Sequence, residues 1–309
     1  MMIKSFGRMT CLALFLCGPA IVFAAEQRAS DADIVPASLV EDRGAANRIE
    51  AGDRLRVLSQ TVPAAVCHLH NGVAVDLAAT QIVDSLAEFD LLTSALLDGD
   101  SILGIEGAEE RRRTRMMITD LQAAWAPMRA AAESIVADPT NAVSAKTAYD
   151  LATALLDQSY ALLSQIEGQY SNPTEILATD TMLLEISGRQ SMMTQRLAFL
   201  ACRMWSGAAD ANYAEKLQQA GSQFEAGFNA LIFGAPGLGV SPPPTEEIAA
   251  ALDAVAADCA TVISKLQNLV ATGQKDPAQA AELYRILTEK TDEMDMIAHL
   301  YAVHSKRVY

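Results

Sequence analysis

Hydrophobic side chains recur at helical spacing in two separate stretches of the chain. Residues three, four or seven positions apart lie on one face of an α-helix, so this spacing predicts a helix with one face packed in a core. The first stripe consists of Leu58, Val62, Ala65 and Leu69, and the second consists of Ile186, Met193, Leu197, Leu200 and Met204. Each stripe predicts the core-facing side of one helix.

Segments rich in glycine, proline and other turn-forming residues divide the chain into helix-sized pieces. They are residues 99–107, 138–141, 168–173, 234–244 and 273–277. Such segments end helices and form turns. The Thr245-Glu246-Glu247 sequence has the composition of a helix start. These segments predict four helices on each side of the Ser171-Asn172-Pro173 sequence, which we expect to end one helix and cap the next.

The chain is similar to itself when it is displaced by 135 residues. This displacement pairs Arg54 with Arg189, Ser59 with Thr194, Gln60 with Gln195, Cys67 with Cys202, Phe89 with Phe224 and Gly99 with Gly234. A repeat of this length predicts tandem structural copies. We therefore predict two four-helix bundles with up-down antiparallel helices, at residues 45–172 and 173–309. One merged, elongated helical assembly is the alternative.

Composition favours the same fold class. Aromatic residues make up 6% of the chain, and Ala, Leu, Met, Gln and Glu are abundant. These are helix-forming residues, whereas strands are rich in aromatic and β-branched residues. We expect an all-α protein with almost no strand.

The N-terminal segment has the pattern of a secretory signal peptide at residues 1–25. Lys4 and Arg8 precede an apolar run from Met9 to Phe23, and small residues follow. We expect cleavage and a periplasmic protein; a membrane anchor formed by an uncleaved signal is the alternative. Cleavage removes two basic residues, so the formal charge moves from -15 to -17. This charge excludes nucleic acid as a partner and disfavours anionic lipid.

The motifs of common enzymes and cofactor proteins do not occur in the sequence. It has no Cys-x-x-Cys-His haem site, no Glu-x-x-His di-iron pattern and no Gly-x-Ser-x-Gly nucleophile elbow. His68 and His70 lie two residues apart and face different sides of a helix, and His299 and His304 lie five apart. We therefore predict no metal, no cofactor and no enzymatic activity.

Three cysteines follow the predicted signal: Cys67, Cys202 and Cys259. Cys202 and Cys259 are expected at similar heights on the first and third helices of the second bundle, so a disulfide between them is one interpretation. Diagonal helices of a bundle are too far apart for this bond. Three buried free thiols are the other interpretation. Both leave Cys67 unpaired.

Arginines flank the predicted core stripes. Arg189 and Arg196 lie at the edges of the second stripe, Arg54 lies at an edge of the first, and Arg56 points outward. An edge arginine can bind an oxyanion with help from neutral hydrogen-bonding groups, or it can pair with acids on neighbouring helices. The candidate ligand-binding residues are Arg54, Arg56, Ser59, Gln60, Arg189, Gln190, Thr194, Gln195 and Arg196.

The sequence of residues 188–198, GRQSMMTQRLA, resembles the opening signature of the PilJ-type domain, the periplasmic sensing domain of type IV pilus methyl-accepting chemotaxis transducers. Residues 52–60, GDRLRVLSQ, form a looser version. The looser copy contains Pro63, which we expect to remove a helical hydrogen bond and to kink or start the helix.

The same class is similar to the sensor region of NarX-type nitrate/nitrite receptors. This resemblance implies that Arg56 binds a small anion at the interface of a homodimer. Ser191 stands at the matching position of the second copy, so the anion would bind in the first copy only. The resemblance implies a sensor without its own transmitter, signalling through a membrane-bound receptor or another signalling partner. A scaffold or adaptor that contacts a membrane receptor or pilus component is the alternative.

Overall fold

The computed structural model describes residues 44–170, 178–207, 212–273 and 276–307. These residues form eight α-helices and a short 3-10 helix, Pro236–Leu238, with two isolated β-bridges and no strand. The α-helices are α1 (Ala45–His70), α2 (Val75–Asp98), α3 (Arg112–Ala137), α4 (Ala142–Tyr170), α5 (Ala178–Trp205), α6 (Asn212–Phe233), α7 (Glu246–Thr272) and α8 (Pro277–Arg307). The all-α prediction is confirmed.

Two expected features lie outside the described residues. They are the signal peptide at residues 1–25 and the turn at residues 171–173. Within the described part of the chain, no helix combines the length and hydropathy that a membrane crossing requires.

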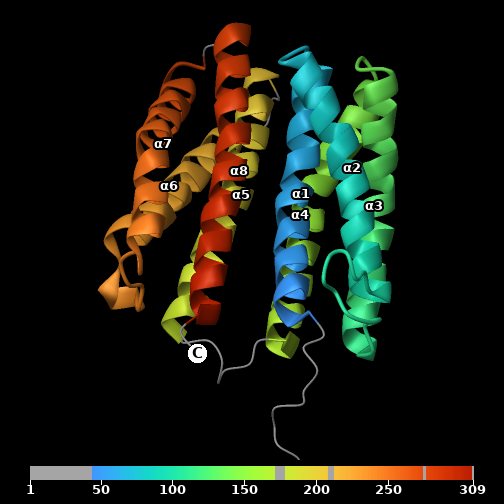
Figure 1. Cartoon of the computed structure of the whole chain (residues 1–309). Coiled ribbons are helices and arrows are strands. Elements are labelled where there is room, and N and C mark those ends of the chain that lie inside the picture. Colours follow the sequence, from blue (N-terminus) through green and yellow to red (C-terminus); the bar gives the residue numbers. More distant parts are fainter. Residues whose placement is uncertain (1–43, 171–177, 208–211, 274–275, 308–309) are drawn as a thin grey trace, which may run out of the picture. The chain divides into compact units, whose positions relative to one another are not determined.

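The helices pack in two groups of four (Figure 1). In the first group α1 contacts α2 and α4, and α3 contacts α2 and α4; in the second, α5 contacts α6 and α8, and α7 contacts α6 and α8. Short connections, such as residues 71–74 and 138–141, reverse the chain between neighbouring helices. Each group is therefore an antiparallel four-helix arrangement, whereas the domain boundary near residue 172 stays a prediction.

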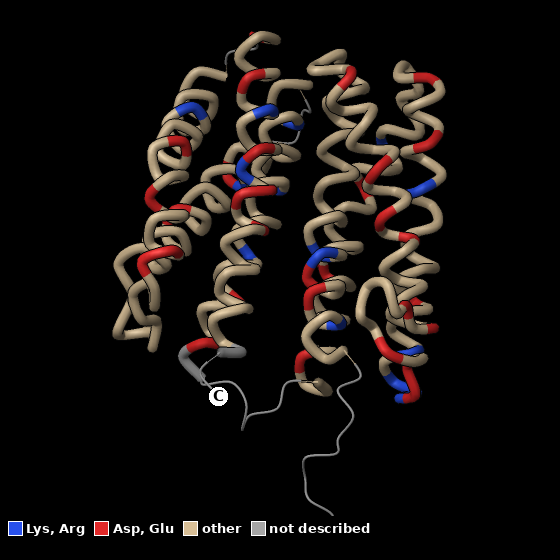
Figure 2. The backbone as a smooth tube through the Cα atoms, in the orientation of Figure 1, with Lys and Arg blue, Asp and Glu red and all other residues tan. Residues whose placement is uncertain are grey.

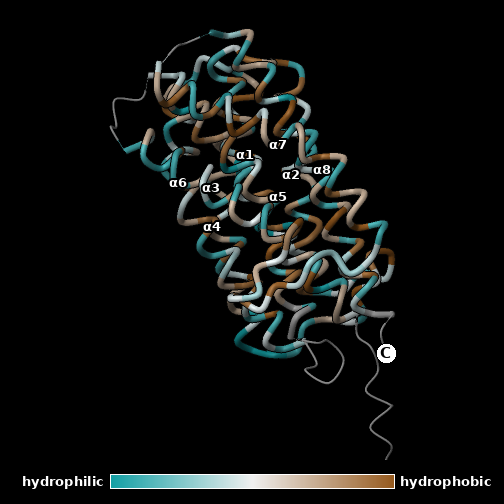
Figure 3. The backbone as a smooth tube through the Cα atoms, turned by 90° about the vertical axis from the view of Figure 1, so that its left-hand side faces the viewer, coloured by the Kyte–Doolittle hydropathy of each residue, from teal (hydrophilic) through white to brown (hydrophobic). Residues whose placement is uncertain are grey.

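The two groups meet along α1 and α5, which contact each other directly, and residues 42–309 form one compact unit. The predicted stripe residues of both helices are buried or packed against the core. Charged residues of α1 end at Arg56, and its second half has none (Figure 2). Elsewhere hydrophobic and hydrophilic positions alternate along the helices (Figure 3). The second half of α1 is buried because its own group covers one side and α5 covers another.

Helix α1 runs through Pro63 without interruption. The proline cannot donate a hydrogen bond to the carbonyl of Ser59, so that oxygen needs another partner. The side-chain Nε2 of Gln60 donates to it at 3.1 Å and also donates to the Ala152 carbonyl at 3.1 Å. The expectation that Pro63 starts a helix is therefore wrong, because this amide satisfies the freed carbonyl.

A disulfide joins Cys67 on α1 to Cys202 on α5, with Cα atoms 6.1 Å apart. Cys259 is a buried free thiol. Both sequence interpretations, a Cys202–Cys259 bond and three free thiols, are therefore wrong. Each treated a bundle as separate, whereas the packing of α1 against α5 brings the two cysteines together.

We call the boundary between the two helix groups, where α1 contacts α5, the seam. Its contacts are reciprocal. The bonded cysteines are 135 residues apart. The ring of His68 stacks on the ring of Tyr284 with centroids 3.7 Å apart, and the Arg203 guanidinium lies 4.0 Å from the ring centroid of Tyr149. Position 68 plus the displacement is 203, and position 149 plus the displacement is 284. Such exchange of equivalent contacts is the property of a two-fold arrangement.

Candidate ligand-binding cavity

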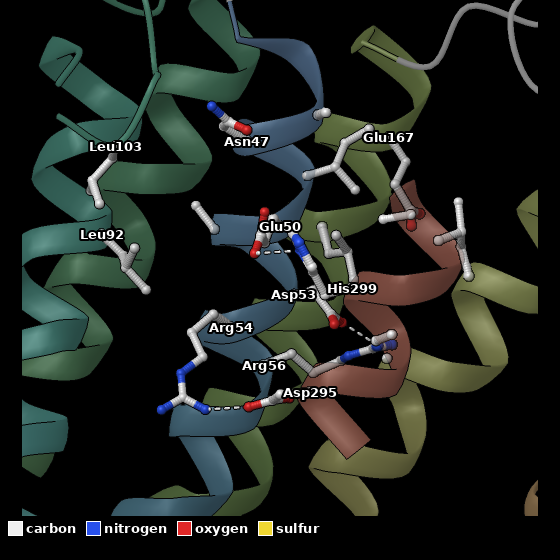
Figure 4. Close-up of a pocket in the computed structure, with 18 of the residues that line it drawn as sticks. Asn47, Glu50, Asp53, Arg54, Arg56, Leu92, Leu103, Glu167, Asp295 and His299 are labelled. Carbon is white, nitrogen blue, oxygen red and sulfur yellow. Dashed lines mark hydrogen bonds and ion pairs between the residues drawn. The ribbon is translucent and has the colours of Figure 1, made fainter. Parts of the chain in front are cut away.

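A cavity of about 630 Å³ lies at the end of the seam where α1 begins. Its walls come from α1, α2, α4, α5 and α8 and from the connection between α2 and α3 (Figure 4). Apolar side chains on the walls include Ile49, Leu92, Leu103, Ile105, Leu163 and Leu184. Pockets of about 300–1,000 Å³ with mostly apolar walls and a few polar groups are typical small-molecule sites.

The connection between α2 and α3 forms one wall and has a defined conformation. Asp100 and Ile105 exchange two backbone hydrogen bonds of 2.8 Å. The Asp100 carboxylate accepts from the amides of Ile102 and Leu103 at 2.8 and 3.1 Å. This turn places Leu103 and Ile105 on the cavity wall.

Two residues at the start of α1 hold this connection in place. The buried Arg48 donates to the carbonyls of Leu96 at 3.1 Å and Gly107 at 2.5 Å. Asn47 donates through Nδ2 to the Gly104 carbonyl at 3.0 Å. The wall is therefore fixed to α1 by charged and neutral hydrogen bonds.

The polar part of the cavity is dominated by carboxylates. Six of them line it, with two arginines: Glu50, Asp53, Glu88, Glu167, Glu185, Asp295, Arg54 and Arg56. Arg54 bonds Glu88 through Nε and Asp295 through NH1, both at 2.7 Å. Arg56 bonds Asp53, and its NH1 lies 3.3 Å from Glu185. Each arginine therefore already forms ion pairs with two carboxylates.

Arg56 is 1% exposed, and its guanidinium lies 4.8 Å from the ring centroid of Tyr160. Arg56 was expected to point outward from the core stripe, and the structure buries it because the contact between α1 and α5 covers this side of α1. Its Nε has no hydrogen-bond partner within the described part of the protein. A buried donor without a partner costs roughly 1–3 kcal/mol, so this nitrogen is a position that a ligand acceptor would stabilise.

Three carboxyls in the cavity, Asp53, Glu167 and Asp295, have pKa values raised mainly by burial. Burial, reinforced by the nearby Glu185, raises the pKa of Glu167 to about 7. Partial burial raises the pKa of Asp295 to about 6, and this effect outweighs the opposing effect of its ion pair with Arg54. Near neutral pH the charge of the cavity therefore depends on pH.

Of the predicted ligand-binding residues, Arg54 and Arg56 reach this cavity and the other seven do not. Ser59 donates to the Arg56 carbonyl at 2.7 Å, while the Gln60 side chain bonds α1 and α4 backbone carbonyls. Thr194 and Gln195 lie 2.6 and 2.7 Å from the Thr291 hydroxyl. Gln60, Thr194 and Gln195 therefore hold helices together, whereas the Ser59 bond lies within α1.

The remaining predicted residues also lie away from the cavity. Arg189 is exposed, Gln190 is buried near Gly227, and Arg196 is half-buried. Burial lowers the pKa of Arg196 despite the nearby Tyr160 and Asp157. The predicted set is therefore divided between the seam, the helix contacts and the surface.

Sequence reasoning predicted none of the six acidic residues of the cavity as a site residue. Glu167 comes from the end of α4, Glu185 from the start of α5 and Asp295 from α8. One signal was present, since Glu50 and Glu185 are separated by the same 135 residues as the other repeated positions. The positions of Glu167 and Asp295 depend on how the groups pack, which helical spacing does not encode.

Residues 176–286 match the PilJ family. The family is described as the N-terminal domain of type IV pili methyl-accepting chemotaxis transducers. The PilJ match covers α5, α6, α7 and the first part of α8, and it includes the cavity residues Leu184, Glu185 and Gly188. The PilJ-type resemblance of residues 188–198 is confirmed. No curated protein matches the chain. The PilJ match supports a role in sensing or signalling, which involves interaction with partners.

Proposed function

We propose that this protein is a non-catalytic periplasmic sensor with two tandem PilJ-type domains, which binds a small ligand in the seam cavity and signals through a partner. The observation that carries the proposal is the cavity itself, because both helix groups contribute walls to it in a chain with a PilJ match. Export rests on the signal-like pattern of residues 1–25.

The second domain of the proposal rests on the 135-residue displacement. Cys67 and Cys202, which this displacement pairs, form the disulfide. The β-bridges Asp100–Ile105 and Ala235–Val240 are also 135 residues apart. These agreements support a duplication that gave residues 45–172 the same fold as the matched segment.

The location of the cavity supplies a route for a signal. Arg56 on α1 lines the cavity, and the disulfide at Cys67 lies 11 residues further along the helix, which is about 17 Å at 1.5 Å per residue. A ligand that binds one spacing of the two groups better than another shifts the population toward that spacing. The bond keeps α1 and α5 together at one end while the cavity end adjusts.

A NarX-like version of the proposal places nitrate or nitrite on Arg56. Such an anion must displace Asp53 or Glu185 from a buried guanidinium. Calorimetry with nitrate and nitrite tests this version. Absence of heat, or binding that Arg56→Ala leaves unchanged, contradicts it without affecting the cavity proposal.

The cavity proposal is tested by a thermal-shift screen of small organic ions and neutral compounds on the whole chain. Ala298→Trp fills the cavity, and Ala254→Trp, at an exposed position on α7, is the matched control. We expect a stabilising ligand whose effect disappears in Ala298→Trp and persists in Ala254→Trp. A screen without any such ligand contradicts the proposal.

A scaffold or adaptor for a membrane receptor or pilus component is the second candidate. It is favoured by exposed apolar side chains at the connections after α2 and α6: Ile102 is 95% exposed, Phe233 71% and Leu238 72%. Changing Phe233 and Leu238, neither of which lines the cavity, to serine should abolish co-purification with the receptor and leave the ligand-induced thermal shift intact. Unchanged co-purification contradicts this function.

A further inference from the structure

We propose that the seam cavity binds an organic cation, an ammonium or guanidinium with an apolar body and an oxygen acceptor. This inference rests on the proposed sensor function and names the class of its ligand. The proposed ligand has the opposite charge to nitrate or nitrite, and three features of the cavity support it.

The first feature is the charge balance. Arg54 is shared by Glu88 and Asp295, and Arg56 is shared by Asp53 and Glu185. Six carboxylates against two arginines leave an excess of four carboxylates in the lining when all are ionised. A cation entering this space is attracted, and an anion is repelled unless it displaces a carboxylate.

The second feature is Glu167, a carboxylate that has no ion-pair partner among the described residues. Glu167 has no hydrogen bond or ion pair to any residue that the structure describes. It lies near the carboxylates of Glu185 and Asp53, and this environment, with burial, holds its pKa at about 7. Among the described residues, the Glu50 carboxylate has only the His299 imidazole as a basic partner, at 3.9 Å, and this pair requires a protonated imidazole. A ligand ammonium near Glu167 would relieve repulsion that the nearby Arg56 offsets only in part.

The third feature is the buried Arg56, 1% exposed, whose Nε lacks an acceptor and which lines the cavity. This N–H exposes less than 1 Å², so an oxygen on the ligand can accept from it after a small shift of the Arg56 side chain, while the cationic group faces the carboxylates. Leu92 and Leu103 lie on the opposite side of the cavity view from Glu167 (Figure 4), and Glu88 is a charged lining residue on the same helix as Leu92. The site therefore combines an acidic side, one donor and an apolar wall.

A matched series of phenyl compounds tests the charge preference. Phenylalaninol is the cation, 3-phenyl-1,2-propanediol replaces its ammonium by a hydroxyl, and 3-phenyllactate is an anion with the same phenyl and hydroxyl groups. Calorimetry with the whole chain at pH 8 keeps Glu167 ionised. We expect phenylalaninol to bind at least about tenfold more tightly than the diol and 3-phenyllactate to give no binding heat.

Two charge-neutralising variants locate the binding. Glu167→Gln should weaken the binding of phenylalaninol by about tenfold, because it removes the charge of the unpaired carboxylate and keeps the shape of the side chain. Glu225→Gln removes the same charge from an exposed position on α6 and should leave the affinity unchanged.

The outcomes separate this inference from the function on which it rests. Binding of 3-phenyllactate or nitrate that Ala298→Trp abolishes, with no binding of phenylalaninol, overturns the cation and keeps the sensor. Equal affinities for phenylalaninol and the diol, an unaffected Glu167→Gln variant, or no heat from phenylalaninol also overturn the inference. The sensor proposal falls only when the wider screen yields no cavity ligand.

Discussion

The disulfide across the seam gives the largest stability effect that the structure predicts. Replacing Cys67 and Cys202 together by alanine opens a covalent loop with a sequence separation of 135 residues. The chain-entropy relation gives about 5 kcal/mol for a loop of this length, and native disulfides are typically worth about 2–5 kcal/mol. We therefore expect the free energy of unfolding to fall by about 3–5 kcal/mol.

Thermal unfolding followed by circular dichroism measures this loss. One kcal/mol shifts Tm by about 2–4 °C in a chain of comparable size, so the double variant should melt roughly 6–20 °C below the parent. Cys259→Ala is the control, because this buried cysteine takes no part in the bond. It should lose only what a small cavity costs and keep one disulfide.

Chemical analysis can refute the reasoning directly. Alkylation of the unfolded, unreduced protein should label one cysteine of the three after the predicted signal, and peptide mapping should join the peptides that contain Cys67 and Cys202. Three labelled cysteines, a mapped bond to Cys259, or a double variant with unchanged Tm each contradicts the assigned bond or its stabilising role.

Three further predictions follow from the cavity and the helix ends. The folded-state pKa of Glu167, about 7, exceeds its ordinary value of 4.5, so its contribution to stability falls as pH rises between these values. Discounted for partial exposure, Glu167→Gln should raise the free energy of unfolding by about 1 kcal/mol at pH 8 and leave it unchanged at pH 4. Thermal melts measure this difference, and an equal effect at both pH values contradicts the prediction. Arg48→Met leaves the carbonyls of Leu96 and Gly107 without their donor, which should cost about 3 kcal/mol and accelerate amide exchange between α2 and α3 but not between α6 and α7. Thr245→Ala removes the hydroxyl that accepts from the third amide of α7 and should cost about 1 kcal/mol in denaturant titrations, whereas Thr245→Ser should cost little.

Much of the fold could be predicted because it depends on local patterns. Helical spacing located the buried faces of α1 and α5, and turn residues located the ends of α2, α3, α6 and α7. The start of α7 was predicted from Thr245, which accepts a hydrogen bond from the Ile248 amide at 3.2 Å. Such signals act within one or two helical turns, so a single sequence contains them.

The candidate site was less predictable because it depends on how two helix groups meet. Arg56 points away from the core stripe of its own helix, and helical geometry alone assigns that direction to solvent. The contact with α5 buries it instead. Cys67 was set aside as unpaired for the same reason, although its equivalence to Cys202 under the 135-residue displacement was visible in the sequence.

The reciprocal seam has a consequence for how a response depends on concentration. Two separate subunits with the same contacts would dissociate on dilution and would carry the same residues at both positions. Here one chain and one disulfide join the two groups, so dilution cannot separate them, and Arg56 faces a seam where its counterpart is Ser191. Ligand binding at the cavity should therefore follow a simple one-to-one isotherm that is independent of protein concentration.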